Sequence, residues 1–203
     1  QRNHLLKLTA AKEVEDTLFI WDEKLAEAAQ PIMAERKRFV ERLSPLCENF
    51  HSELSGGKET LKAIYEPSVE GEEGELKEKL LNTLRVSLDR DIKNKVTGNG
   101  PHKDDIAFKL GDKDLRWFGS QGQQRTAALA LKLAQLELIK EELGEYPVLL
   151  LDDVLSELDV SRQERLLGRL KGIQALITAA ELSESLKKLP ARIIKVKEGK
   201  LYL

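Results

Sequence analysis

The sequence predicts an α/β protein in two parts, a helical arm followed by a portion with a parallel sheet and flanking helices. Two observations carry this prediction. Apolar residues recur at helical spacing through the first third of the chain, and the apolar run Val148–Leu151 is followed by a helical segment and a second apolar run, Ile173–Ile177. A strand, a helix and a strand in this order favour a parallel pair. We place the boundary so that 1–104 form a mainly helical arm domain and 105–203 the sheet-bearing portion.

Composition narrows the class of protein. The 203 residues include 33 Lys and Arg and 35 Asp and Glu, which gives a formal net charge of −2. This near balance provides no bulk attraction for nucleic acid, so any such site must come from local patches. The single cysteine excludes an internal disulfide framework and suits a reducing, cytoplasmic compartment. No run predicts a membrane span, so we expect no membrane partner. Because the first residue is Gln1, we expect a piece of a longer protein.

The first third of the chain predicts a long helix. Apolar residues from Val14 to Ile32 and, after a gap, from Phe39 to Leu54 follow one another at spacings of three and four, a seam typical of a helical arm or hairpin. A projecting arm and an ordinary amphipathic helix packed on its own domain explain this seam equally well. Pro31 lies inside the pattern, so we expect a kink or a break there. His4 and His51 are expected on the surface of the arm.

The remaining elements are short except for one helix. In chain order we expect a strand at 61–65, a helix at 75–94, a hairpin of strands at 106–110 and 115–118, a buried helix at about 122–143, a helix at about 160–171, and a closing hairpin of 192–196 and 201–203. The Gly-rich segments between them read as turns.

The run Val148–Leu151 carries the first functional signal. Since it is continuous and lies between a proline and two acids, we expect a strand that is buried on both faces. Asp152 and Asp153 follow it directly, at the end of a strand where open α/β sheets bind ligands. A carboxylate there is costly to bury unless it meets a cation, so Mg²⁺ on a nucleotide phosphate is the natural partner. A surface turn with solvated acids is the alternative explanation.

A second signal is the sequence GSQGQQR at 119–125, directly before the long helix. Ser120 can cap that helix, and Gly122 lets a backbone approach a ligand closely. The amides and dipole at a helix start favour an anion such as phosphate. Taken alone, however, this stretch is explained better by a plain Ser/Gly cap.

Taken in order, GSQGQQR, a long helix, VLLLDD and SELD resemble the C-terminal half of an ABC-type ATPase head. The resemblance implies that Asp152 organises the magnesium ion of a bound nucleotide. It also implies that Asp153 activates the attacking water, at a position where most members have Glu. The predicted fold is then a helical arm domain plus the C-terminal half of such a head.

The same resemblance assigns two segments to a dimer interface. The family's signature motif matches Gly119–Gln123, and it contacts the triphosphate bound by the other subunit of a head-to-head dimer. Ser156–Asp159, SELD, resembles the D-loop, which crosses that interface. The residues that this implies as contacts to ATP or across the dimer are Ser120, Gln121, Gly122, Gln123, Ser156 and Asp159. Thr178, at the position of the usual switch histidine, is implied as a polar contact to the γ-phosphate.

The nucleotide site is incomplete in this chain. LSGGK at 54–58 matches the signature letters, but a predicted strand follows it instead of a long helix. Gly57-Lys58 is not a phosphate loop either, because Glu59 follows and no Gly stands five residues before Gly57. The chain therefore lacks a Walker A motif. The resemblance then implies that ATP and Mg²⁺ both require a phosphate loop upstream of Gln1.

Within this superfamily the chain is similar to the RecF family of bacterial recombination mediators. The residues that carry the similarity are QRN at the start, GPHKDD at 100–105, SQGQQRTAALALKLAQLEL and LLLDDVLSELD. The resemblance implies ATP-dependent homodimerisation on DNA at gaps and single-strand/double-strand junctions, and cooperation with RecR and RecO in loading RecA. It implies a weak DNA-dependent ATPase for the intact protein, whereas this chain alone is expected to be inactive.

Local basic residues are the candidates for contact with DNA. They lie in a basic cluster of the arm and around GPHKDD, and they are Arg36, Lys37, Lys93, Lys95 and Lys103. A solvated charged face explains them as well. His102 with its neighbouring acids makes a poor metal site, because one His without a second clear ligand set does not fit a metal, and a charged turn explains the segment better.

Two other functions fit parts of the sequence. In the first, the chain acts only as a docking module for a protein partner such as RecR and has no ATPase activity. In the second, Asp152, Asp153, Glu157 and Asp159 form a metal-hydrolase cluster, which would show metal-dependent nuclease or phosphatase activity without ATP.

Overall fold

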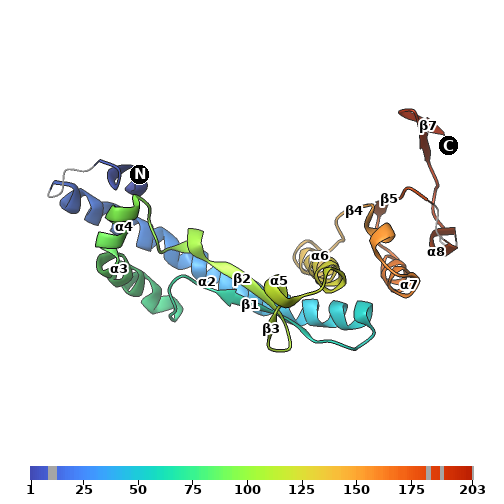
Figure 1. The fold of residues 1–203 in the computed structure, drawn as a ribbon, viewed down its shortest axis with the longest axis horizontal. Helices are drawn as coiled ribbons and strands as arrows, with labels where there is room; N and C mark the ends of the chain where they lie inside the picture. The colour runs from blue at the N-terminus through green and yellow to red at the C-terminus, as the bar shows by residue number, and fades with distance from the viewer. Residues whose placement is uncertain (9–12, 182–183, 188–189, 203) are drawn as a thin grey trace.

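The computed structural model describes residues 1–8, 13–181, 184–187 and 190–202. It is elongated, with the N-terminal and C-terminal regions at opposite ends (Figure 1). One helix, α2 (Glu13–Ser55), runs for 43 residues and supports both halves. Buried apolar side chains form two clusters along it, one on its N-terminal part and one on its C-terminal part. The predicted α/β class with a helical arm is thereby confirmed.

The first cluster packs α2 against α3 (Leu76–Val86). Small residues on α2, Ala26 and Ala29, allow Leu80 and Leu84 of α3 to approach closely. The predicted helix at 75–94 is two helices, because the chain turns at Ser87 before α4 (Leu88–Asn94) begins. The other short elements of this half are α1 (Arg2–Leu5), η1 (Glu73–Glu75) and η2 (Pro101–Lys103).

Of the kink or break expected at Pro31, the break is absent, because α2 continues through Pro31 and Pro45. A proline inside a helix removes one backbone hydrogen bond and costs roughly 3 kcal/mol. Ala29 and Met33, on either side of Pro31, are both buried against α3. In proteins, tertiary packing of this kind supplies most of a helix's stability and can offset such a loss.

His51 is buried and not on the surface, which corrects the prediction for this residue. It continues the helical stripe of Cys47 and Leu54, which points into the second cluster, so the phase of α2 turns it inward. Neither ring nitrogen has a hydrogen-bond partner among the described residues. Burial is the main cause that lowers the pKa of the His51 ring, which favours the neutral form.

A small antiparallel sheet lies beside α2. Strand β1 (Leu61–Glu66) pairs with β2 (Asp105–Leu110), which pairs with β3 (Lys113–Asp114). The strands predicted at 61–65 and 106–110 are therefore present. The pairing joins segments from the two sides of the predicted boundary at 104 and 105, and that division stays a prediction.

The segment predicted as a strand at 115–118 is instead the short helix α5 (Leu115–Phe118). The Asp114 carboxylate accepts a hydrogen bond of 2.8 Å from the backbone nitrogen of Arg116, which caps the helix. Leu115 is buried while Trp117 and Phe118 are exposed. Local capping thus decides the conformation of these four residues over their strand-forming side chains.

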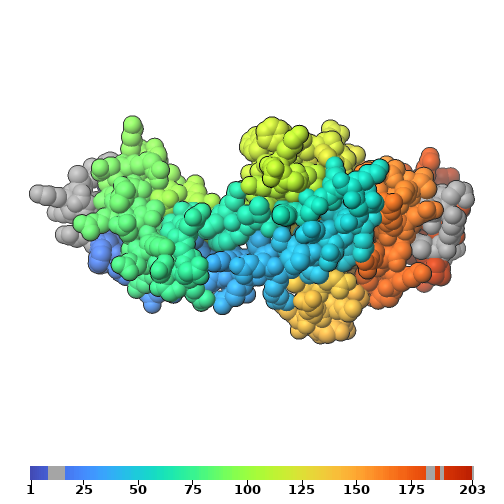
Figure 2. Space-filling view, turned by 90° about the horizontal axis from the view of Figure 1, so that it is seen from below, coloured from blue at the N-terminus to red at the C-terminus, as the bar shows by residue number. Residues whose placement is uncertain are grey.

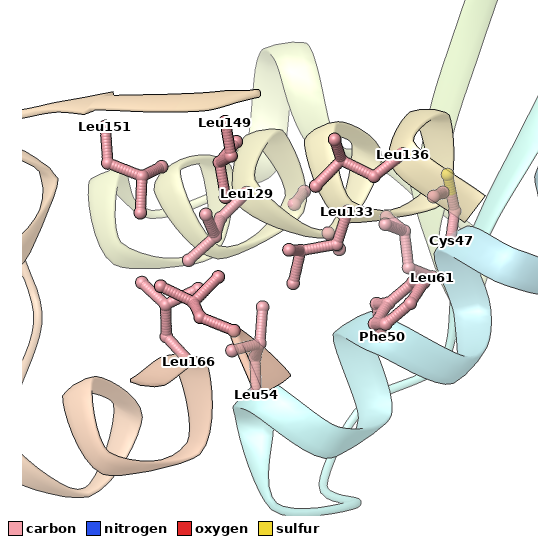
Figure 3. Close-up of a cluster of buried hydrophobic side chains, with 14 of the residues drawn as sticks. Cys47, Phe50, Leu54, Leu61, Leu129, Leu133, Leu136, Leu149, Leu151 and Leu166 are labelled. Atoms are coloured by element: carbon pink, nitrogen blue, oxygen red, sulfur yellow. The ribbon is translucent and has the colours of Figure 1, made fainter. Parts of the chain in front are cut away.

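The second cluster forms where α6 (Gln121–Leu143) crosses the C-terminal half of α2 (Figures 1 and 3). Leu129, Leu133 and Leu136 of α6 face the side of α2 that carries Phe50 and Leu54. The α6 helix follows its prediction closely and ends at Gly144, which adopts the left-handed conformation with φ 80°.

The rest of the second half packs on this cluster. Strands β4 (Leu149–Asp152) and β5 (Ala175–Thr178) form the predicted parallel pair. Helix α7 (Val160–Arg169) contributes Leu166 to the core, and it lies against the end of α2 in Figure 2. The remaining elements are η3 (Val154–Glu157), α8 (Glu184–Lys187), β6 (Lys195–Lys197) and β7 (Lys200–Tyr202). The last two form the predicted closing hairpin, and Leu203 lies outside the described residues. None of the described helices is long and apolar enough to cross a membrane.

Only one face of β4 is covered, which corrects the prediction of a strand buried on both faces. Leu149 and Leu151 are 5% and 3% exposed, whereas Leu150 is 70% exposed. On the neighbouring strand, Leu176 is 55% exposed. The reason is that α6 and α7 cover one face of this two-stranded sheet, and no described segment covers the other.

Substitutions on the two faces of β4 should therefore differ in their effect on stability. Leu151→Ala should lower the free energy of unfolding by about 2–5 kcal/mol, the usual cost of a buried Leu→Ala change. Leu150→Ala, its matched control, should change that free energy by less than about 0.5 kcal/mol. Urea unfolding of the 203-residue chain measures both, and equal losses would contradict the one-sided packing.

Candidate functional site

The end of the parallel pair brings three of the predicted site residues together. The register of the sheet places Asp152 beside Thr178. The Thr178 hydroxyl donates to Asp152 Oδ1 at 2.5 Å and accepts from the backbone nitrogen of Asp153 at 3.0 Å. One hydroxyl thus orients the side chain of Asp152 and the main chain of Asp153. All three residues are exposed, so this edge is open to a ligand.

Asp153 has an unusual backbone conformation. Its φ of 50° and ψ of 20° lie in the left-handed region, which residues other than Gly, Asn and Asp rarely adopt. This conformation turns the chain from β4 into η3, and the Ser156 hydroxyl fixes the turn by donating to the Asp153 carbonyl at 2.8 Å. The chain therefore changes direction between Asp152 and the SELD segment.

The start of α6 is held by a capping box. The Ser120 hydroxyl accepts from the backbone nitrogen of Gln123 at 3.3 Å, and Gln123 Oε1 accepts from the backbone nitrogen of Ser120 at 2.8 Å. Ser120, Gln121 and Gly122 are exposed, and a Cβ added at Gly122 would meet only one guanidinium nitrogen, at 4.0 Å. An exposed start of a 23-residue helix is a suitable place for an anion.

The predicted D-loop lies next to this helix start. Arg125 of α6 forms an ion pair of 3.0 Å with Glu157. Asp159 caps α7 by accepting from the backbone nitrogen of Arg162 at 2.9 Å. Beneath the segment, the buried side-chain amide of Gln163 donates to the carbonyls of Leu155 and Leu158, at 2.8 and 3.1 Å. The ion pair of Arg125 with Glu157 therefore places the predicted signature and D-loop segments next to each other.

The acids of this region do not assemble a metal centre of their own. Among the described residues, no group of three or more His, Cys, Asp or Glu side chains lies close enough together to hold a metal ion. Mg²⁺ is commonly bound through one or two carboxylates together with substrate phosphates and water. Asp152 fits that role, because it is exposed at a strand end and Thr178 contacts only one of its two oxygens.

The five predicted DNA-contact residues divide into two groups. Arg36 pairs with Asp104 at 3.0 Å and also donates to the Pro101 carbonyl, while Lys37 lies 3.5 Å from Glu72. The second group is exposed and forms no ion pair with the described residues; it consists of Lys93, Lys95 and Lys103. Contact with DNA stays a prediction for all five.

The GPHKDD segment is built around a buried carboxylate. The Asp104 side chain is 2% exposed and accepts hydrogen bonds from the Tyr65 hydroxyl at 2.5 Å and the Ser68 backbone nitrogen at 2.9 Å. Burial, together with the bond to Asp104, raises the pKa of Tyr65. His102 Nε2 lies 3.0 Å from the Thr97 carbonyl. These contacts are those of a structural turn.

One contact of the signature segment had no signal in the sequence. Gln123 Nε2 donates to Glu59 Oε1 at 2.5 Å, although the two residues are 64 positions apart. Glu59 directly follows LSGGK, the segment whose letters resemble the signature motif. The ion pair of Arg125 with Glu157 was also missed, because the two residues belong to the separate motifs GSQGQQR and SELD and neither motif indicates that they meet.

Comparisons with known proteins give a consistent result. No family model matches the chain. The DNA replication and repair protein RecF of Lachnoclostridium phytofermentans is 47% identical over 185 residues, which cover 91% of this chain and 50% of that protein. The RecF protein of Acetivibrio thermocellus is 42% identical over 209 residues, which cover 100% of this chain and 57% of that protein. The chain thus spans about half the length of the curated relatives it matches.

Solved structures agree with the sequence comparison. The structure of the recombination mediator protein RecF-ATPrS in the RecFOR pathway matches with a TM-score of 0.84 and 41% identity, over 98% of this chain and 54% of that one. The corresponding RecF-ATP structure matches with a TM-score of 0.80 and 44% identity, over 90% of this chain and 50% of that one.

The left-handed backbone at Asp153 makes its substitutions predictable. Asp153→Asn should leave the free energy of unfolding within about 0.5 kcal/mol, because Asn tolerates this conformation. Asp153→Val should lower it by roughly 1–2 kcal/mol, because a branched side chain is strained there. Urea unfolding of both variants checks this, and a Val variant as stable as the Asn variant would show that the turn is not constrained.

Proposed function

Because the chain belongs to the RecF family, we propose that it supplies half of the ATP-binding, dimerising head of a DNA replication and repair protein. In this proposal Asp152 holds the Mg²⁺ of a bound ATP and Asp153 orients the attacking water. The phosphate loop comes from sequence outside this chain. The observation that carries the proposal is the Thr178 hydroxyl, which ties Asp152 and Asp153 together at the exposed end of β4.

The chemistry of phosphoryl transfer supports these roles. It requires an acid that holds the metal, a residue that orients water, and donors on the γ-phosphate. When bound, Mg²⁺ neutralises charge on the phosphate oxygens. A carboxylate that accepts a hydrogen bond from a neighbouring side chain, as Asp152 does from Thr178, keeps its orientation toward such an ion. The Thr178 hydroxyl already donates its proton to Asp152. In the proposed contact with the γ-phosphate, Thr178 can donate only after this hydrogen bond to Asp152 breaks.

We place the missing donors on a second copy of the protein. The exposed start of α6, with Ser120, Gln121 and Gly122, offers backbone amides and the positive end of a long helix. Ser156 and Asp159 belong to the same short segment as Glu157, which pairs with Arg125 of α6. Both segments are therefore available to one partner surface, and ATP bound between two copies would stabilise the homodimer.

The proposed role of the whole protein follows from the family. It dimerises with ATP on DNA at gaps and single-strand/double-strand junctions, in the cytoplasm, and cooperates with RecR and RecO in loading RecA. Slow hydrolysis then acts as a release step. The best candidates for phosphate contact are Lys93, Lys95 and Lys103, which carry no ion pair with described residues, whereas Arg36 and Lys37 are partly engaged by acids.

The 203-residue chain alone should neither bind ATP tightly nor hydrolyse it, because the phosphate loop is absent from its sequence. Phosphate release and the polarisation of a fluorescent ATP analogue measure this, with the longer protein as the positive control. ATP turnover by the purified chain above a no-protein blank would refute the expectation. Metal-dependent nuclease or phosphatase activity without ATP would instead support the metal-hydrolase alternative.

In the longer protein, Asp153→Asn should preserve ATP-driven dimerisation and lower the hydrolysis rate by about 10²-fold, the usual contribution of a positioned base. Sedimentation with ATP and a phosphate-release assay separate the two effects. Asp153→Asn is a clean probe because Asn adopts the same backbone conformation. Unchanged turnover would remove Asp153 from the proposed role.

A further inference from the structure

Both polar atoms of the Gln123 side-chain amide form hydrogen bonds within this chain. Its oxygen accepts from the backbone nitrogen of Ser120 at 2.8 Å, and its nitrogen donates to Glu59 at 2.5 Å. The exposed residues of the helix start are Ser120, Gln121 and Gly122, whereas Gln123 is half-buried. Gln123 is therefore placed to hold the helix start, and its neighbours are placed to meet a ligand.

Glu59 belongs to a turn that is itself firmly attached. Gly56 and Gly57 have φ of 76° and 75°, and the Gly57 nitrogen donates to the Ser52 carbonyl at 2.7 Å to close the end of α2. A Cβ added at Gly56 would come within 3.0 Å of the Arg165 guanidinium. The positive φ favours glycine at this position, and a Cβ would crowd the guanidinium of Arg165.

The same turn is also attached to the helix that follows the D-loop. Arg165 Nη1 of α7 donates to the Leu54 carbonyl at 3.0 Å. Arg169, one turn later on α7, forms an ion pair with Glu53. The end of α2 therefore contacts α7 through two arginines and contacts the signature segment through Glu59.

From these contacts we infer that Glu59 is a positioning residue. It orients the signature segment at the start of α6 and keeps that segment in a fixed position relative to the D-loop. This role rests on the proposed function, because it matters when a partner's ATP meets the helix start. Glu59 acts through Gln123 and does not itself touch the nucleotide. A bond from a neutral amide to a charged carboxylate is among the stronger hydrogen bonds, so its loss has a measurable effect.

The test uses the longer protein and three variants. Glu59→Ala removes the acceptor, Glu59→Gln keeps an oxygen that can accept from Gln123, and Lys58→Ala is the matched control, since Lys58 is the exposed neighbour. We expect Glu59→Ala to weaken ATP-driven dimerisation by about 10-fold, and the other two to stay within about 3-fold of wild type. ATP affinity of the monomer should not change in any of them.

Amide exchange on the same variants separates positioning from general damage. Exchange of the Ser120 and Gln123 amides should accelerate in Glu59→Ala, while the amides of Leu133 and Ala134 in the buried part of α6 stay protected. Combining Glu59→Ala with Gln123→Ala should cost less than the sum of the two single changes, because both remove the same bond.

The outcomes are distinct. A wild-type protein that does not dimerise with ATP overturns the proposed function and this inference with it. A wild type that dimerises, together with a Glu59→Ala variant of equal dimer affinity or unchanged amide exchange, overturns the inference alone. Loss of monomer ATP affinity or of protection throughout α6 in Glu59→Ala would also overturn it, because the residue would then be supporting the fold as a whole.

Discussion

The apolar face of α6 packs against the C-terminal half of α2, and the functional segments are attached to that contact. Phe50 and Leu54 of α2 meet Leu129, Leu133 and Leu136 of α6 in one cluster. Burying each of these five side chains contributes about 1.5–3 kcal/mol, whereas the one hydrogen bond of Gln123 to the charged Glu59 contributes about 1.5–3 kcal/mol in total. The apolar contact therefore places the start of α6 beside the end of α2, and the polar contacts adjust its orientation. Strand β4 and helix α7 bury their own leucines in the same cluster. One apolar core therefore positions both the acids at the end of β4 and the predicted D-loop.

One face of β4 and the start of α6 are left uncovered by the described residues. Leu150 and Leu176 are more than half exposed on a two-stranded sheet, and the relatives that match this chain are about twice as long. Asp152 and Thr178 lie at the edge of that sheet, and Ser120 to Gly122 lie exposed on the adjoining surface. In the proposed function, an ATP site built from these residues takes its phosphate loop from elsewhere in the protein and, for the helix start, requires a second copy. The first requirement follows from the absence of a phosphate-loop motif in this sequence, and the second from the resemblance to ABC-type heads.

Much of the fold could be predicted because its signals are local and repeated. Periodicity over many turns identified α2 and α6, and the order of apolar runs identified the parallel pair β4 and β5. The family resemblance assigned Asp152, Asp153 and Thr178 to one nucleotide site, and the parallel pairing of β4 with β5 brings these three residues together. The predictions that were wrong depended on a few residues or on what packs against the element in the folded chain. One carboxylate from Asp114 made 115–118 a helix, the phase of α2 buried His51, and the number of layers over β4 could not be read from its composition. The bond between Glu59 and Gln123 had no local pattern and required the packed structure.

The most direct test of a site shared by two copies is complementation between two inactive variants of the longer protein. Asp153→Asn disables the water-orienting acid. Gly122→Glu places a negative charge at the exposed helix start without a clash inside its own chain, because the space around Gly122 is open. If the two segments act on different nucleotides, a mixed dimer contains one intact site, and random mixing should restore about a quarter of wild-type turnover. If both segments act on the same chain's nucleotide, every site in the mixed dimer is damaged. A mixture as inactive as its two components would contradict the account.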